Sequence, residues 1–437
     1  MKRMNNSVIA LALFAGFANM HAQEKKMLTL DEAVQLGIRN SKSLKIDAAN
    51  IEGATADLLE AKNRQLPELT VSGSYLYLPL KPNINLKLPG VSGEGGPEVH
   101  QVAYGSANIS VPIYSGGRIK YGIESAKYLV EASRLSTEND KISIAYNVAQ
   151  AYNNLFKANQ SIKVLEENLS ASQKRDETFL KLENNGLIAR NDRLKANLQT
   201  LNIELQLLEA RNNYNIANIN MDLLLGLPEA TEIEVDQNYI EEAEEVKAVD
   251  FYLNTARENR KDLQALEKQR QAAALGTKSA KAENLPSIAF TGGYVAADIP
   301  KFLTIYNAVN VGVGISYNLS NLWKENSSLR QSQAREMQLS ANNELLNDNI
   351  KLDVNREYQN TDYSKKRIAV FEKSAEQANE NYRITKNKYD NGLATMTELL
   401  DADAAQIAAN VGVINAKADA SLAYRKLLQT TGTLTIK

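Results

Sequence analysis

The 437-residue chain has no cysteine, two histidines, one tryptophan and only nine prolines. Without cysteine there are no disulfides, no thiolate metal sites and no lipid-modified N-terminal cysteine. Because His21 falls in a segment that we expect to be removed, His100 is the only histidine of the mature chain. One histidine and no cysteine make most metalloenzyme and nucleophile–base constellations unavailable, so we expect no catalytic residue, no metal and no cofactor.

Long hydrophobic runs and a strong charge of one sign are also missing. No later segment has the length and apolarity of a transmembrane helix, and the formal net charge of −2 provides no basic field for nucleic acid. Residues 1–22 are typical of a secretory signal, since Lys2 and Arg3 precede a short apolar run and Ala22 suits cleavage. We therefore expect a secreted, periplasmic or outer-membrane protein.

The chain does contain two copies of one pattern. Gln65-Leu66-Pro67 recurs as Asn284-Leu285-Pro286 at an offset of 219 residues, and Asn185-Gly186-Leu187 recurs as Asn391-Gly392-Leu393 at an offset of 206. The 13 residues by which the offsets differ are placed in the loop of the first hairpin, Pro79–Gln101. A repeat this long is a duplicated half-domain. We expect a first repeat at 23–225, an acidic linker at 226–249 and a second repeat at 250–437.

Each copy predicts a helix, a β-hairpin, a very long helix, a glycine turn and a long returning helix. Alternating apolar residues indicate the strands. Apolar residues seven apart, such as Val148 and Leu155, indicate helices packed in a left-handed coil, and Val354 and Thr361 stand at the same interval in the second copy. Thr29 or Asp31, Asn191 and Thr395 are expected to cap helices. The expected ranges are helices at 30–64, 118–183, 191–225 and 395–431 and strands at 69–77, 103–113, 288–294 and 309–317.

Four amphipathic strands of bilayer-crossing length cannot close a transmembrane barrel, because such barrels begin at about eight strands. An open sheet cannot stay in lipid, since its edge groups would lack hydrogen-bond partners. If the strands cross a membrane, then two, three or four chains must share one barrel, and the physics does not choose among these numbers. The alternative is a soluble four-stranded sheet packed on helices.

Several motifs, in order and at paired offsets, resemble the TolC-like outer-membrane efflux proteins. They are the Leu-Pro before each first strand, Val111-Pro112-Ile113-Tyr114-Ser115-Gly116-Gly117-Arg118, the two Asn-Gly-Leu turns, and the continuations Asn191-Asp192-Arg193-Leu194-Lys195-Ala196 and Thr397-Glu398-Leu399-Leu400-Asp401-Ala402. The resemblance covers essentially the whole mature chain. It implies a mainly α fold with a small β part: a homotrimer with a twelve-stranded β-barrel in the outer membrane and an α-barrel of coiled coils in the periplasm.

The resemblance also implies function. The chain would be the exit duct of a tripartite efflux pump or type I secretion system for small molecules or peptides. It would work with a periplasmic adaptor and an inner-membrane transporter of the RND or ABC type. Adaptor docking and gating would fall to the helical tips, at Gly186, Leu187, Asp192, Tyr389, Gly392 and Leu393.

Glu398 and Asp401 match the acidic rings of the family's pore constriction, and their spacing of three allows one shared helical face. The alternative for both is simple stabilisation of a helix N-terminus. Asp192 matches a residue of the closed state, with surface solvation as its alternative. Ala394 stands where some relatives have an arginine of that closed state, so Arg190, Arg193 or Lys388 would have to replace it.

Two other classes of protein were considered. A periplasmic coiled-coil adaptor would also have long antiparallel helices, but it should show consecutive short strands of a lipoyl-like or β-barrel domain. A soluble enzyme with a helical core is disfavoured because the sequence has no catalytic constellation. The exported substrate and the partner pump do not follow from the sequence.

Overall fold

The computed structural model describes residues 25–80, 82, 99–229, 231–237, 239–240, 246–300 and 302–435. The predicted signal, most of the first hairpin loop and the acidic run 241–245 lie outside the described residues. The elements of the first copy are β1 (Lys25–Leu28), α2 (Leu30–Asn40), α3 (Lys42–Asn63), β2 (Glu68–Tyr77), β3 (Gln101–Tyr114), α4 (Arg118–Asn184) and α5 (Arg190–Leu225). Those that follow are β4 (Glu232–Val235), α6 (Val249–Asn259), α7 (Lys261–Ala282), β5 (Ser287–Ile299), β6 (Leu303–Ser316), η1 (Leu319–Leu322), α8 (Ser327–Asp390) and α9 (Met396–Thr430).

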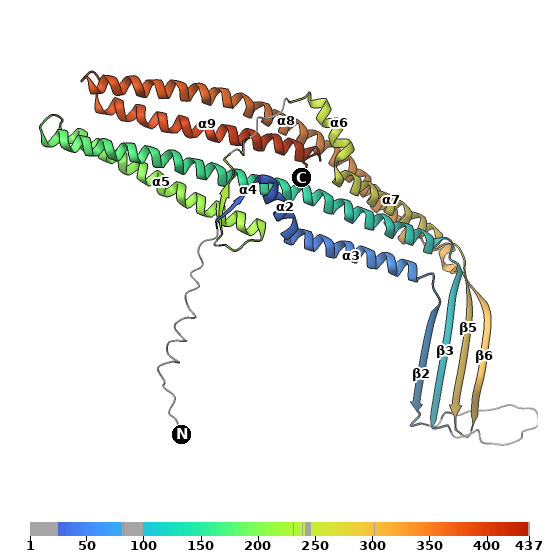
Figure 1. The fold of residues 1–437 in the computed structure, drawn as a ribbon. Helices are drawn as coiled ribbons and strands as arrows, with labels where there is room; N and C mark the ends of the chain where they lie inside the picture. The colour runs from blue at the N-terminus through green and yellow to red at the C-terminus, as the bar shows by residue number, and fades with distance from the viewer. Residues whose placement is uncertain are drawn as a thin grey trace, which may run out of the picture. The chain divides into compact units, whose positions relative to one another are not determined.

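The duplication is visible in the lengths of the helices (Figure 1). α2 and α6 have 11 residues each, and α3 and α7 have 22 each. The long helices α4 and α8 have 67 and 64 residues, and the returning helices α5 and α9 have 36 and 35. The first hairpin is joined by residues 78–100 and the second by 300–302, which confirms the longer loop in the first copy.

The predicted single helix at 30–64 is wrong, because the chain breaks at Ser41. The backbone of Ser41 has a ψ of 124°, outside the helical range, and its N–H donates to Ile38 O at 3.4 Å. Its hydroxyl then accepts from Leu44 N at 3.3 Å and starts α3. Arg260 breaks the second copy in the same way, with a ψ of 119°. Neither site contains glycine or proline, so the sequence carries no strong stop signal there.

The four predicted strands form one antiparallel sheet in the order β2-β3-β5-β6, so β3 and β5 join the two halves. The register confirms the predicted alternation. One face carries Leu69, Val71, Tyr75, Tyr77, Ala103, Ala107, Ile109, Val111, Ile288, Phe290, Tyr294, Val309, Val311, Val313 and Ile315. The other carries Thr70, Ser72, Ser106, Asn108, Ser110, Thr291 and Asn310. We call these the apolar and the polar face of the sheet.

A second, two-stranded parallel sheet, β1 with β4, was not predicted. Four residues each are too few to show a clear period. Tyr152 of α4 fastens this sheet, because its fully buried hydroxyl donates to Leu28 O and accepts from Asp236 N, both at 2.8 Å. The same core includes Val148, Leu155, Met221, Leu225 and Ile233.

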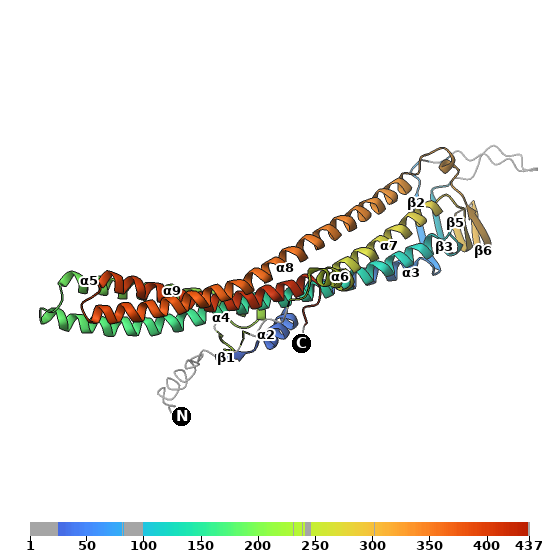
Figure 2. The ribbon, with the colours of Figure 1, turned by 90° about the horizontal axis from the view of Figure 1, so that it is seen from above.

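The heptad positions of the long helices are confirmed as core positions. Val148, Leu155, Val354 and Thr361 are all buried. The helices α4 with α5 and α8 with α9 form two antiparallel hairpins that lie side by side in both views (Figure 1, Figure 2). Leu165 of α4, Ile203 of α5 and Ile407 of α9 share one core cluster, so the two hairpins pack on each other.

The chain divides into two compact units, and each unit draws on both copies of the repeat. The helical unit is Met1–Ile46, Thr137–Lys261 and Asn347–Lys437, and the sheet unit is Asp47–Ser136 and Asp262–Leu346. In the described parts of both units, no helix combines the length and the apolarity needed to cross a membrane.

Candidate functional site

The two glycine turns have the same backbone geometry. Gly186 and Gly392 have φ values of 70° and 72°, in the left-handed region that glycine tolerates best. In each turn the leucine after the glycine donates its N–H to a carbonyl of the preceding helix, Leu187 to Leu182 at 2.9 Å and Leu393 to Lys388 at 2.7 Å. These bonds satisfy carbonyls that the end of a helix would otherwise leave without partners.

Each turn projects an apolar side chain. Leu187 is 70 % exposed and Leu393 is 77 % exposed. The backbone bond of each leucine fixes its position, so neither side chain is needed to close the turn. A single exposed leucine is ordinary, but the same exposed leucine at the same point of both turns makes a repeated surface feature.

The returning helices begin differently. At α9, Thr395 is the predicted cap: its hydroxyl accepts from Glu398 N at 3.3 Å, and Glu398 Oε2 accepts from Thr395 N at 2.6 Å. At α5 the cap is Ala189, without a side-chain bond, so the predicted cap Asn191 is wrong. Asn191 lies inside the first turn of α5, so its side chain is past the position from which it could accept hydrogen bonds from the first free N–H groups.

Glu398 therefore has a structural role in the single chain. The backbone N–H of Thr395, and then its hydroxyl, lower the pKa of Glu398, with a smaller contribution from Lys388. Asp401, one turn further along, is exposed and does not belong to the capping box. Helix capping thus explains the presence of an acidic residue at Glu398 but not at Asp401. Both carboxylates are exposed to solvent.

No hydrogen bond joins Tyr389 and Asp192 in the described structure, although the charge of Asp192 acts on the tyrosine. Burial raises the pKa of Tyr389, and the negative charges of Asp192 and then Asp390 raise it further. The ring packs edge-on against Phe179, with centroids 5.9 Å apart. Asp192 Oδ1 instead lies 3.6 Å from Lys195 Nζ. Of the three cations considered in place of an arginine at Ala394, Arg193 already pairs with Glu183 across its own turn.

A buried ion pair close to the tips was missed by the sequence analysis. Arg175 Nη2 of α4 lies 3.1 Å from Asp403 Oδ1 of α9, and the two side chains are 14 % and 3 % exposed. A core cluster nearer the glycine turns includes residues of both hairpins: Phe179, Ala196, Met396 and Leu399. The pair spans 228 residues of sequence, and no local pattern could have indicated it.

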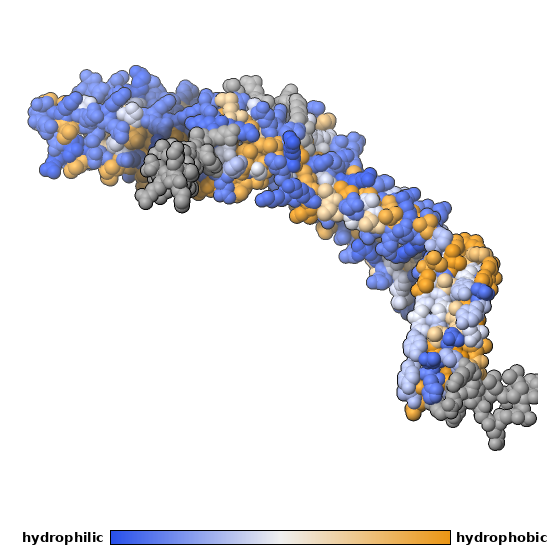
Figure 3. All heavy atoms as spheres, turned by 60° about the horizontal axis from the view of Figure 1, so that its bottom comes forward, coloured by the Kyte–Doolittle hydropathy of each residue, from blue (hydrophilic) through white to orange (hydrophobic). Residues whose placement is uncertain are grey.

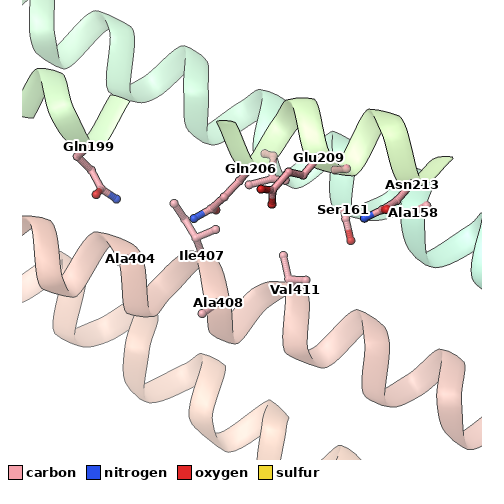
Figure 4. Close-up of a pocket in the computed structure, with 12 residues that line it drawn as sticks. Ala158, Ser161, Gln199, Gln206, Glu209, Asn213, Ala404, Ile407, Ala408 and Val411 are labelled. Atoms are coloured by element: carbon pink, nitrogen blue, oxygen red, sulfur yellow. The ribbon is translucent and has the colours of Figure 1, made fainter. Parts of the chain in front are cut away.

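A groove between α4, α5 and α9 opens further along the hairpins (Figure 4). Its volume is about 390 Å³. Polar side chains of α5, including Gln206 and Glu209, face small and aliphatic side chains of α9, including Ala408 and Val411. Among the described residues no cluster of His, Asp or Glu could hold a metal ion. The groove thus combines small and aliphatic side chains with dispersed polar groups.

Comparison with protein families identifies the family to which the chain belongs. The family model for the outer membrane efflux protein matches residues 33–227 and 252–433, which are the two copies of the repeat. The chain belongs to the outer membrane efflux protein family. A sequence comparison with curated proteins returns no match.

Solved structures show the same fold as this outer membrane efflux protein. VceC, an outer membrane protein of Vibrio cholerae, is 18 % identical, with a TM-score of 0.77 over 92 % of this chain and 96 % of that chain. The CmeC outer membrane channel of Campylobacter jejuni is 18 % identical, with a TM-score of 0.76 over 93 % and 86 %. The open MtrE channel of Neisseria gonorrhoeae is 17 % identical, with a TM-score of 0.72 over 93 % and 89 %.

The resemblance found in the sequence motifs is thereby confirmed, and the adaptor alternative is set aside. The outer membrane efflux protein is mainly α with a small β part, and it acts as an outer-membrane exit duct of efflux pumps.

Proposed function

We propose that three copies of the chain form the duct and that the glycine turns form its gated periplasmic entrance. The observation that carries a shared barrel is a sheet with two open edges, because β2 and β6 each pair on one side only. The number three is what the family resemblance implies. Unpaired edges beside an apolar face are not stable in lipid. Pairing β6 of one copy with β2 of the next is a head-to-tail contact, and three such contacts close a twelve-stranded ring.

The helical unit supports the same pairing. α5 presents a stripe of half-exposed leucines three and four residues apart: Leu194, Leu198, Leu201, Leu205 and Leu208. α8 presents exposed apolar residues of its own, among them Tyr363, Val370 and Ile384. Spacing of this kind suits the seam of a coiled coil. We infer that α5 of one copy packs against α8 of the next.

The entrance would then contain three copies of each glycine turn. Leu187 and Leu393 are the apolar contacts that we assign to a periplasmic adaptor, which would connect the duct to an inner-membrane transporter of the RND or ABC type. Asp192 and Tyr389, each within five residues of a glycine turn, would hold the resting contacts between neighbouring hairpins. Separation of the hairpins would open the entrance.

Glu398 and Asp401 would supply six carboxylates to a narrow throat in the trimer. Acidic rings of this kind attract cations and repel anions. The capping bond occupies only Oε2 of Glu398, so Oε1 and both oxygens of Asp401 can act on passing ions. Cargo that carries positive charge is therefore the substrate class that this entrance favours.

The experiment combines native mass spectrometry with planar-bilayer conductance. The purified protein should have about three times the mass of the mature chain. Glu398→Gln with Asp401→Asn removes the charges but keeps the capping box, because glutamine also serves at that position. The double variant should lose cation selectivity and block by divalent cations. Glu32→Gln is the matched control, since Thr29 and Glu32 form the same capping box at α2.

Each outcome has a distinct meaning. A monomer in native mass spectra would refute the trimer. Selectivity that stays the same in the double variant would show that the two acids only stabilise α9. A loss of selectivity in Glu32→Gln of similar size would show that the effect is not specific to the entrance.

A further inference from the structure

The junction between β3 and α4 contains a groove with no role in the proposed duct. Its volume is about 480 Å³, within the usual range of small-molecule sites. The groove belongs entirely to the sheet unit. Its lining combines the end of the strand, Pro112 to Tyr114, and the next residue, Ser115, with the first turns of the helix, Ile119 to Lys127.

The apolar wall of the groove continues the apolar face of the sheet. The register of β3 shifts between Pro112 and Tyr114, so Ile113 and Tyr114 together oppose Ile288, a residue of that face. Ile113 and Tyr114 are both exposed. Ile119 and Ile123 of α4 extend the apolar lining by one helical turn. Apolar residues gather over this end of the sheet in the space-filling view (Figure 3).

The polar wall carries charges of both signs at helical spacing. Lys120 and Lys127 are seven residues apart, Glu124 lies between them, and all three line the groove. Residues at intervals of three and four share one face of a helix. Within the described part of the chain, no ion pair joins Lys120 or Lys127 to an acidic side chain. The hydroxyl-bearing Ser115 completes the polar wall.

We propose that this groove binds the head group of a zwitterionic phospholipid that carries a primary ammonium, of the phosphatidylethanolamine class. Lys120 and Lys127 would hold the phosphate, Glu124 would hold the ammonium, and the acyl chains would follow Ile113 onto the apolar face. The proposal rests on the proposed function, which places the apolar face in lipid and α4 in the periplasm.

Charge complementarity favours this ligand over its alternatives. An anionic head group such as phosphatidylglycerol satisfies the lysines but leaves Glu124 facing a negative charge. A quaternary choline cannot donate hydrogen bonds to Glu124, whereas a primary ammonium can. Free phosphate fits the lysines but makes no use of the apolar wall. Two cations and one anion beside an exposed apolar surface match a phosphate and an ammonium attached to acyl chains.

The test measures lipid retention by the delipidated full-length protein in detergent. Defined amounts of phosphatidylethanolamine, phosphatidylglycerol or phosphatidylcholine are added, and bound lipids are counted per chain by native mass spectrometry. The wild type should retain phosphatidylethanolamine best. Lys120→Gln with Lys127→Gln should lower its affinity by about tenfold. Glu124→Gln should remove the preference over phosphatidylglycerol.

Lys174→Gln with Lys181→Gln is the matched control, because these exposed lysines lie on the same helix at the same spacing. The control should retain wild-type binding. Equal retention by the Lys120/Lys127 variant and the wild type would overturn the proposal, as would complete competition by inorganic phosphate at equal concentration. Binding is counted per chain, so the result stands whether or not the trimer forms. A monomeric mass in the same spectra would count against the proposed function alone.

Discussion

Breaking the buried pair between Arg175 and Asp403 should destabilise the helical unit strongly. Arg175→Met leaves the Asp403 carboxylate, which is 3 % exposed, without its counter-charge. The loss of one partner of a buried pair costs about 3–5 kcal/mol, because the remaining charge is no longer compensated. The pair is joined through one atom of each group, since Arg175 Nη1 and Asp403 Oδ2 have no hydrogen-bond partner among the described residues.

That imperfect geometry predicts a rescue. Replacing both partners by apolar residues, Arg175→Met with Asp403→Leu, removes two desolvated charges together. The double variant should recover most of the lost stability, because such replacements are often neutral or stabilising by about 1–4 kcal/mol. Lys157 and Asp419 provide the comparison: they join the same two helices at 2.8 Å, they are 27 % and 31 % exposed, and Asp419 keeps Arg367 as a second partner at 3.4 Å. Lys157→Met should cost only about 0–1 kcal/mol.

The assay is thermal unfolding of the purified protein in detergent, followed by the helical circular dichroism signal. Arg175→Met should lower the apparent midpoint by on the order of 5 °C, and Lys157→Met by much less. Equal losses in the two single variants would refute the argument from burial. A double variant as unstable as Arg175→Met would show that the pair contributes more than the cost of an uncompensated charge.

Two further predictions concern the end of α5. Burial, and then the charge of Glu229, raises the pKa of Asp222 to about 6 from an ordinary value of 3.8. The folded state therefore binds this proton more tightly than the unfolded state. The destabilisation caused by the ionised Asp222 carboxylate is absent below pH 3.8 and complete above about pH 6. Asp222→Asn should stabilise the protein by on the order of 2 kcal/mol at neutral pH and by nothing at low pH, measured as melting midpoints. Gly226→Ala should lower the midpoint at any pH, since φ is +66° and the new Cβ would lie 2.9 Å from Asn40 Cβ, a strain of about 1–3 kcal/mol. Gly53→Ala in α3 is its control, because a Cβ there meets nothing within 4 Å.

The sequence predicted those elements that local patterns determine. The alternation of β2 and β3 and the heptads of α4 and α8 depend on residues two to seven apart, so they can be recognised without the fold. The glycine turns were found because a left-handed residue at the end of a helix favours glycine. The breaks at Ser41 and Arg260 were not found, because each is made by backbone torsions that any residue can adopt.

The contacts that join distant segments could not be predicted. Arg175 meets Asp403 only after two helical hairpins have formed and packed. The sheet of β1 and β4 depends on Tyr152, a residue that reads in sequence as one more heptad neighbour. The bulge after Pro112 turns Tyr114 toward the apolar face, and alternation alone assigns it to the opposite face.

The two copies of the repeat share their backbone geometry more closely than the roles of their side chains. The repeated glycines Gly226 and Gly432 both adopt left-handed torsions, and a Cβ added to either would press against the repeated asparagine at the end of α2 or α6. Asn40 Nδ2 donates to Leu225 O at 2.7 Å and so satisfies a terminal carbonyl of α5. Its counterpart Asn259 bonds to Thr255 O instead, and Arg260 Nη1 donates to Thr430 O at 3.2 Å.

At the tips, too, the two copies share backbone geometry but differ in the roles of their side chains. Gly186 and Gly392 have matching torsions, but Thr395 caps its helix with its side chain, whereas Ala189, the N-cap of α5, makes no side-chain hydrogen bond. Backbone positions persist because the fold fails without them, while any side chain that supplies the required donor or acceptor can replace another. A residue role taken from a relative or from the other copy is therefore weaker than a fold taken the same way. Glu398 illustrates this, since its capping bond would be present whether or not it faces a pore. For that reason the charge-removing variant of Glu398 must preserve the cap, and Asp401, which has no part in the cap, is the more direct probe of the entrance.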